Sequence, residues 1–273
     1  MRVGEAEATG RLRTMLSELS MASGAGLGEV TRTCIGIAGY TIPAVREWAS
    51  REIGDVVGGD LLLCGDEEIA LEGAFSGGPG ILIIAGTGSN FIGRAADGSK
   101  YNVGGWGPAL GDEGSGFWIG QEALRAGFWA KDRGVATILL DEIGAYWGTV
   151  SLGEVVEKGN ERPSPDFAAL APLVARCAAE GDELAQAVLE RAGEELAEQV
   201  ALVALKMSES GPQDEIGVAY TGGVLEHIIP VRQSLIAALQ RSTPQAKVME
   251  GAADSLKGAL WRARSGSLPP AKK

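Results

Sequence analysis

Short apolar runs alternate with amphipathic segments along the first ninety residues. Three runs have the composition of buried strands, and each ends at glycine or at a turn. They lie at residues 33–39, 60–66 and 81–85. Helical spacing predicts helices at 5–22, 43–53 and 67–75, the first with Leu12, Met15, Leu16 and Leu19 on one face. This alternation predicts an α/β fold, with helices packed on a parallel or mixed sheet.

The rest of the chain contains a hairpin, a long helical region and a second strand–helix series. Phe91 to Val103 predicts the hairpin, with its turn at Asp97 and Gly98. Residues 115–206 read as almost wholly helical. The later elements are expected as strands at 216–220 and 247–249, helices at 230–240 and 252–264, and a disordered tail at 265–273.

Composition narrows the class of protein. The 273 residues are 45% hydrophobic and 22% charged, which is typical of a folded protein, and the net charge is −12. Such acidity argues against nucleic acid or an anionic membrane as partner. We find no signal-like start and no apolar run of roughly 20 residues, so we expect a cytoplasmic protein. The three cysteines are expected to be reduced, and a single histidine leaves no zinc motif.

The segment 85–90, Ala-Gly-Thr-Gly-Ser-Asn, follows a predicted strand directly. Its glycines allow positive φ and close approach of a ligand to the backbone. No GKS or GKT follows, and Phe91 stands where a dinucleotide fingerprint has its third glycine. A structural turn and a ligand-binding loop both remain open here.

Asp66 lies at the carboxyl end of a predicted strand, immediately before a helix. Ligands of open α/β sheets gather at such strand ends, which makes this carboxylate a candidate for chemistry. Aspartate is also a common helix cap, and spacing alone favours that structural role.

Two further glycine-rich segments are candidates for binding. Residues 104–116 hold six glycines around Trp106, whose indole offers a flat apolar face to a sugar ring, and Asp112 offers an acceptor for hydroxyl groups. The alternative is a surface loop with a half-buried tryptophan, which the entropic cost of so many glycines disfavours. Gly222 and Gly223 lie between a strand and a helix, a position that suits a phosphate or an adenine edge.

In this order, the segments at 85–90, 104–107 and 111–115 resemble the N-acetylglucosamine kinase group of the BadF/BadG/BcrA/BcrD ATPase family, within the actin-like superfamily of sugar kinases. The resemblance runs from Val3 to about Arg264. It implies a ribonuclease-H-like, actin/hexokinase-type fold of two lobes, at 1–85 and 86–264. It also implies ATP-dependent phosphorylation of the 6-hydroxyl of an amino sugar, with Mg²⁺ held mainly through the nucleotide and water.

The resemblance implies roles for particular residues. Asp66 corresponds to the general base. The sugar-binding positions correspond to Ser89, Asn90, Gly105, Trp106, Gly107 and Asp112. The nucleotide-binding positions correspond to Thr87, Gly88, Gly181, Gly222, Gly223 and His227, although His227 is most simply an exposed helix residue.

The chain departs from the family pattern at its start. Family members begin with a strand and an Asp-Gly-Gly-Gly-Thr-Lys-Thr type loop, which this sequence lacks. We therefore expect an incomplete N-terminal lobe in which strand 33–39 has an open edge. A true start further upstream is favoured over a non-catalytic remnant, because the later site positions all remain.

Two other functions remain as alternatives to the sugar kinase. An activator ATPase of the 2-hydroxyacyl-CoA dehydratase or benzoyl-CoA reductase type would need closely placed cysteines for an iron–sulfur cluster, and Cys34, Cys64 and Cys177 are widely spaced. A sugar-sensing protein without turnover would fit the missing first loop. A homodimer is possible through the open strand edge or the helix expected at 115–130.

Overall fold

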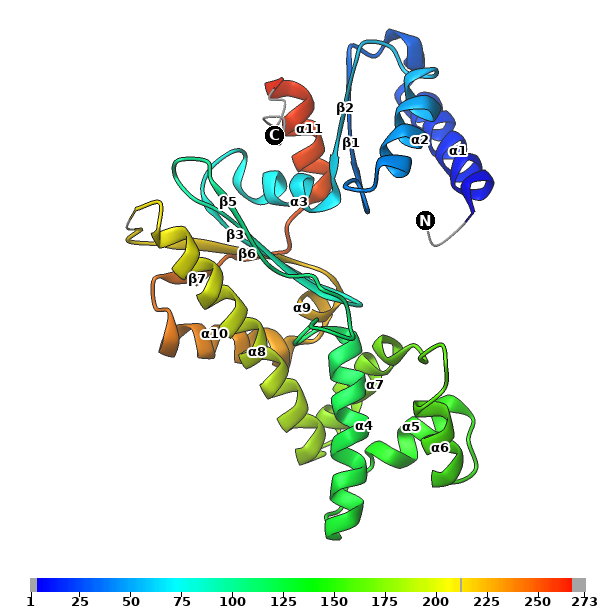
Figure 1. Ribbon diagram of the computed structural model, residues 1–273, viewed down its shortest axis with the longest axis vertical. Helices are drawn as coiled ribbons and strands as arrows, with labels where there is room; N and C mark the ends of the chain where they lie inside the picture. The colour runs from blue at the N-terminus through cyan, green and yellow to red at the C-terminus, as the bar shows by residue number, and fades with distance from the viewer. Residues whose placement is uncertain (1–3, 212, 267–273) are drawn as a thin grey trace. The chain divides into compact units, whose positions relative to one another are not determined.

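The computed structural model describes residues 4–211 and 213–266. They form two compact units (Figure 1). Unit 1 comprises the described residues up to Gly77 together with those from Ala253 onward, and unit 2 comprises those from Gly78 to Ala252. Unit 2 is therefore inserted in the sequence of unit 1. The lobe ranges 1–85 and 86–264 stay a prediction, and most of the expected tail at 265–273 lies outside the described residues.

Unit 1 contains a small parallel sheet with helices on both faces. Strands β1 and β2 pair in parallel, with Cys34 opposite Leu62 and Gly36 opposite Cys64. The elements are α1 (Glu5–Ser23), a 3-10 turn (Leu27–Glu29), β1 (Arg32–Ile37), α2 (Pro43–Gly54), β2 (Asp60–Gly65), α3 (Asp66–Phe75) and α11 (Ser255–Ser265). Among the described residues no other strand joins this sheet, so β1 has an unpaired edge.

The first face of the β1–β2 sheet packs on α1 and α2. Ile35, Ile37 and Leu63 lie against a small core of four buried residues, namely Leu12, Leu16, Ala49 and Ile53. Met15 and Leu19, which were predicted on the same helix face as Leu12 and Leu16, are 45% and 56% exposed. The α1 face that contacts α2 is narrower than the apolar stripe in the sequence.

The other face of the sheet packs on α3 and α11. A buried ion-pair network joins these two helices to each other. The Arg262 side chain, 5% exposed, places Nη2 2.9 Å from Glu68 Oε2 and 3.4 Å from Glu72 Oε1. The Cys64 thiol donates to the Ile35 carbonyl at 3.7 Å, and the neighbouring Cys34 thiol and Arg262 guanidinium lower the pKa of Cys64. Charge therefore joins α11 to α3 in unit 1.

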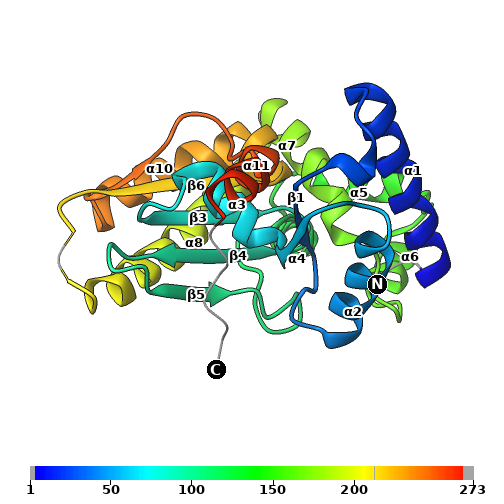
Figure 2. The same ribbon diagram turned by 90° about the horizontal axis from the view of Figure 1, so that it is seen from above.

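Unit 2 is built on a mixed five-stranded sheet with the order β5-β4-β3-β6-β7. Figure 2 shows β6, β3, β4 and β5 side by side. The strands are β3 (Gly80–Ala85), β4 (Ser89–Arg94), β5 (Lys100–Gly104), β6 (Ile216–Thr221) and β7 (Ala246–Val248). Strands β3, β6 and β7 run parallel, while β4 and β5 form the predicted hairpin.

The helices of unit 2 cover the sheet and form a helical group beyond its end. They are α4 (Gly116–Arg133), α5 (Leu139–Trp147), α6 (Leu152–Gly159), a 3-10 turn (Phe167–Leu170), α7 (Ala171–Ala179), α8 (Glu183–Ser208), α9 (Gly223–His227) and α10 (Ile229–Ser242). Helix α8 packs on β3, β4, β5 and α10, and α4 extends away from the sheet (Figure 1). Phe91, Leu189 and Leu196 are among the fully buried side chains of one large core.

The α/β class expected from the sequence is confirmed. Element ends differ from the prediction by one to three residues, and two of these differences have a structural reason. The strand expected at 33–39 ends at Ile37 and is only half-buried, because β1 has one strand neighbour instead of two. The helix expected from residue 252 begins at Ser255, where Asp254 accepts hydrogen bonds from the amides of Leu256 and Lys257. In the described part of the chain, no helix combines the length and apolarity needed to span a membrane.

Candidate functional site

The turn after β3 is a tight connection into β4. The Gly86 amide donates to the Gly88 carbonyl at 2.9 Å, and the chain enters β4 at Ser89. Gly88 is under direct steric constraint, because a Cβ atom there would lie 2.7 Å from Asp112 Oδ2. A Cβ at Gly86 would meet nothing within 4 Å, and Thr87 is exposed. The outer side of this turn is therefore open backbone.

The start of α4 is held by the same turn. The amides of Gly116 and Phe117 donate to the carbonyls of Gly86 and Thr87 at 2.8 and 3.1 Å. Ser115 Oγ accepts from the Trp118 amide at 3.2 Å, as expected of a helix cap. The first amides of α4 are consumed by these bonds, so this helix end does not offer them to an anion.

Asp112 lies beneath the β3–β4 turn and is 5% exposed. Its Oδ1 accepts a hydrogen bond from the Ser89 amide at 3.3 Å, and its backbone has a φ of 67°, which Asp tolerates better than most residues. Burial raises the pKa of this carboxyl, and the amide hydrogen bonds oppose that rise. Ser89 is also buried and donates its hydroxyl to the Glu113 carbonyl at 2.9 Å. Both side chains brace the turn.

Two other positions predicted to contact sugar, Asn90 and Gly105, lie side by side. Asn90 Oδ1 accepts from the Phe91 amide at 3.0 Å, and a Cβ atom at Gly105 would lie 2.9 Å from that oxygen. Trp106 follows directly and is 74% exposed, more than the surface-loop alternative supposed, and this exposure is compatible with a surface loop as well as with a binding loop. The loop folds back on itself at Gly107, whose carbonyl accepts from the amides of Leu110 and Gly111.

A second glycine turn meets the first at the same end of the sheet. Thr221 ends β6 opposite Ile84 of β3, and a Cβ atom at Gly222 would lie only 2.4 Å from the Ala85 carbonyl oxygen. With a φ of 103°, Gly222 also has a conformation that L side chains rarely adopt. Gly223 and His227 are exposed beyond it. The structure therefore brings Thr87, Gly88, Gly222 and Gly223 together.

Glu226 is a site residue that the sequence reasoning missed. Its Oε1 accepts from the Gly222 amide at 2.7 Å and from Thr221 Oγ1 at 3.1 Å. The sequence did contain a signal for this role. A glutamate stands four residues after the first glycine of a strand–turn–helix segment, within reach of the turn. Glu226 sets the conformation of the turn from within the short helix α9.

Gly181 lies elsewhere in unit 2. It lines a hollow of about 820 Å³ between residues 135–138 and the start of α8, where Asp182 accepts hydrogen bonds from Thr137, Ile138 and Ala185. Residues 135–138 follow the far end of α4, whose 18 residues span about 27 Å. The structure thus does not bring Gly181 together with Gly222, and its role in nucleotide binding stays a prediction.

Asp66 is the first residue of α3 and belongs to unit 1. The N-cap position is taken by Gly65, and no side-chain cap hydrogen bond is made there, so the capping alternative is not what is observed. The Asp66 carboxylate is exposed at the carboxyl end of β2. This placement leaves the carboxylate available for chemistry.

The donor groups at these turns fit a nucleotide and its magnesium ion. Open backbone at Gly86 and Gly223, where a Cβ would meet nothing nearer than 3.9 Å, allows phosphate oxygens to approach amide groups. Among the described residues no cluster of three or more His, Cys, Asp and Glu side chains could hold a metal ion alone. Mg²⁺ is commonly held by substrate phosphates, water and one or two carboxylates, which this arrangement can provide.

Comparison with known proteins gives consistent results. A family model described as the BadF/BadG/BcrA/BcrD ATPase family matches residues 1–260. An N-acetylmuramic acid/N-acetylglucosamine kinase from Clostridium acetobutylicum is 31% identical over 93% of this chain and 85% of its own length. An N-acetyl-D-glucosamine kinase from Dictyostelium discoideum is 27% identical over 83% of this chain and 73% of its own.

Solved structures share the fold. A Chromobacterium violaceum protein, provisionally described as an N-acetylglucosamine kinase, superposes with a TM-score of 0.69 at 28% identity, over 94% of this chain and 87% of its own. A Porphyromonas gingivalis protein of the same provisional description gives a TM-score of 0.68 at 19% identity, over 97% and 88%. The second likeness bears on the fold alone.

Proposed function

The chain belongs to the BadF/BadG/BcrA/BcrD ATPase family, and on that premise we propose that it transfers the terminal phosphoryl group of ATP to the 6-hydroxyl of an amino sugar. The curated relatives are sugar kinases, which does not favour the activator-ATPase alternative. Within the amino sugars, N-acetylglucosamine and N-acetylmuramic acid are the first substrates to test, because they are named in the Clostridium acetobutylicum relative.

The observation that carries this proposal is the meeting of two glycine turns at the carboxyl ends of β3 and β6. Parallel strands that end together in an α/β sheet form the usual place for a ligand. Thr87 and the amides near Gly86 and Gly223 would bind phosphate oxygens, since both glycines leave the backbone open. Gly222 and Glu226 would keep the two turns in contact.

The sugar would bind on the loop that follows β5. Trp106 exposes an apolar ring face on which the C–H face of a pyranose can pack. Asn90 and Gly105 lie next to it, so an amide group and open backbone are within the same loop cluster. Asp112 and Ser89, both buried, would act by holding this cluster in shape.

Asp66 would accept the proton of the attacking hydroxyl. Phosphoryl transfer passes through a loose transition state, so positioning counts for more than the strength of the base. Mg²⁺, when bound with the nucleotide, would neutralise the charge that develops on the transferred group. We therefore infer that Asp66 acts as the base, while Thr87 binds phosphate oxygens and Trp106 packs on the sugar ring.

The test is an ADP-release assay on the wild-type chain and on Asp66→Asn, with N-acetylglucosamine, N-acetylmuramic acid and glucosamine as acceptors. We expect sugar-stimulated ADP release from the wild type and a fall in kcat of about 10²- to 10⁴-fold in the variant, the usual contribution of a positioned base. Asp55→Asn is the matched control, since Asp55 is an exposed aspartate of unit 1 outside the site. Sugar binding without any ADP release would instead support a sugar-sensing role.

A further inference from the structure

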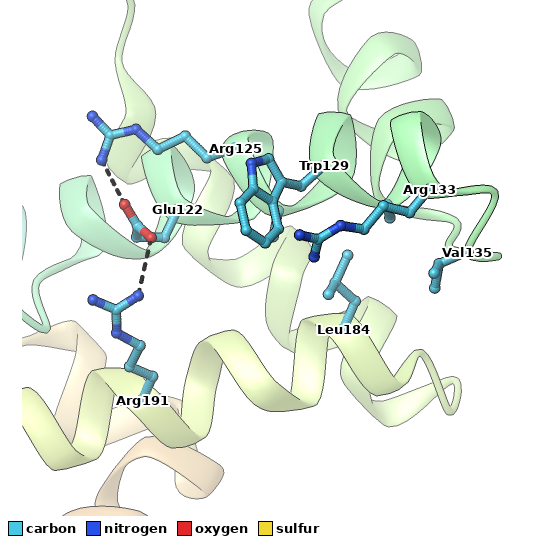
Figure 3. Close-up of a pocket in the computed structure, with 9 residues that line it drawn as sticks. Glu122, Arg125, Trp129, Arg133, Val135, Leu184 and Arg191 are labelled. Carbon is cyan, nitrogen blue, oxygen red and sulfur yellow. Dashed lines mark hydrogen bonds and ion pairs between the residues drawn. The ribbon is translucent and has the colours of Figure 1, made fainter.

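A hollow of about 410 Å³ lies on unit 2 between the second half of α4 and the first half of α8 (Figure 3). Its volume is within the usual range for small-molecule sites. The proposed catalytic turns contact α4 at Gly116, and Arg125 of the hollow lies nine residues, or about 14 Å, further along that helix. The hollow is therefore separate from the candidate functional site.

Three guanidinium groups and one carboxylate line this hollow. Glu122 lies between two arginines, with Oε1 2.5 Å from Arg125 Nη1 and Oε2 3.6 Å from Arg191 Nη1 (Figure 3). Within the described chain no carboxylate forms an ion pair with Arg133, whose guanidinium lies 3.6 Å from the centre of the Trp129 ring. On a chain of net charge −12, the lining of this hollow has an excess of positive charge.

The same hollow has an apolar side. Trp129 is 62% exposed, and Val135 and Leu184 lie close to Arg133 in Figure 3. An exposed indole beside guanidinium groups suits a ligand with an anionic end and a compact ring, because arginine binds phosphate in a planar, bidentate manner and an indole packs on ring faces.

We propose that this hollow binds a phosphomonoester carried on a ring, either a phosphorylated sugar or a nucleoside monophosphate. The phosphate replaces Glu122 as the partner of Arg125 and Arg191, while Arg191 keeps its second ion pair, with Glu195 Oε1 at 3.3 Å. The ring packs against Trp129. Arg133 supplies the charge that no carboxylate of the described chain compensates. Glu122 thus competes with the ligand for the two guanidinium groups. The proposal therefore predicts that replacing Glu122 strengthens binding, whereas replacing Arg125 or Arg191 weakens it.

The test is calorimetric titration of the full chain with N-acetylglucosamine 6-phosphate and, separately, with AMP. N-acetylglucosamine and a non-hydrolysable ATP analogue are present in excess, so that the proposed catalytic site is occupied. Inorganic phosphate, titrated in the same way, measures the contribution of the anion alone. Because binding is read directly, the result is independent of whether the chain is a kinase.

We expect binding of one of the two ring phosphates, weakened about tenfold by Arg125→Gln or Arg191→Gln, the effect of losing one charge-assisted hydrogen bond. Glu122→Gln should strengthen binding several-fold, and Trp129→Leu should weaken it for the ring compound but not for inorganic phosphate. Arg241→Gln is the control, because Arg241 forms an exposed ion pair with Glu194 of α8 and is not part of the hollow.

Two results would overturn the proposal. One is the absence of binding for both ring phosphates at millimolar concentration. The other is binding that Glu122→Gln fails to strengthen while the arginine variants leave it unchanged. The substituted arginine side chains are 64% and 60% exposed, so the variants are expected to fold normally.

Discussion

Glu72 in unit 1 and Asp112 in unit 2 are both almost fully buried carboxylates, at 3% and 5% exposure, but their surroundings differ. Glu72 faces the Arg262 guanidinium, 3.4 Å away, in a network that joins α3 to α11. Asp112 accepts a backbone amide of the β3–β4 turn and has no cation in ion-pair range among the described residues, and burial raises its pKa.

The comparison shows two ways in which a buried carboxylate can stabilise the structure around it. Unit 1 has a half-buried two-stranded sheet and a small apolar core, so a buried ion pair joins its distant segments. Unit 2 has a large apolar core, and its buried carboxylate serves a turn at the candidate site. Perturbed carboxyl groups of the second kind occur often at functional sites.

Arg262→Met should give the largest effect on stability. Removing the cation breaks the buried ion pair of Glu72, whose carboxylate still accepts a hydrogen bond from the Gly77 amide at 2.9 Å. Breaking a buried ion pair in this way typically costs about 3–5 kcal/mol. We expect faster amide hydrogen exchange in β1, β2 and α3, with little change in β3 and β6. Arg264→Met is the matched control, since Arg264 is an exposed residue of the same helix. Equal exchange rates in wild type and Arg262→Met would show that charge does not hold unit 1 together.

Gly222→Ala should have the next largest effect on stability, and this effect concerns unit 2. The new Cβ would clash with the Ala85 carbonyl at 2.4 Å in addition to the strain of a positive φ, so we expect a loss of about 2–3 kcal/mol. In Gly181→Ala the backbone has a similar positive φ, but no atom lies within 4 Å of the new Cβ. We expect the free energy of unfolding of this variant to fall by only about 1 kcal/mol. Urea unfolding of both variants measures the difference, and equal losses would rule out a steric constraint between the two turns.

Asp112→Asn should have the smallest effect, below about 1.5 kcal/mol, because asparagine keeps an oxygen acceptor for the Ser89 amide. In the wild type, the unfolded chain releases this proton near 3.8 and the folded chain releases it at higher pH. The free energy of unfolding therefore falls as pH rises through that interval. The variant lacks this fall, so its stability relative to wild type should increase from pH 4 upward and then level off. A flat difference in urea unfolding between pH 4 and 7 would contradict the assigned shift.

The sequence predicted the elements of both units because their signals are local. The glycine-terminated runs, the turn at Asp97 and Gly98, and the spacing of α8 each depend on residues within one element. The glycine turns at 85–90 and 222–223 were also predicted. The steric reason for glycine at position 88 depends on Asp112, which lies 24 residues further along the chain and was singled out for another role.

The missed features are contacts between distant segments. Arg262 and Glu72 are 190 residues apart, and no periodicity connects them. The hollow around Trp129 depends on α4 and α8 lying together, and each of its arginines alone reads as an ordinary charge on a helix surface. The burial of Ser89 and Asp112 likewise required the packing of one loop beneath another.

The insertion of unit 2 into unit 1 has a consequence for synthesis on the ribosome. Glu68 and Glu72 are translated long before Arg262, and at about 5–20 residues per second the gap of 190 residues between Glu72 and Arg262 takes roughly 10 to 40 seconds. During that time the whole of unit 2 emerges before Arg262 can pair with the nascent α3. Helix α3 is therefore expected to reach its final packing only after unit 2 has been made.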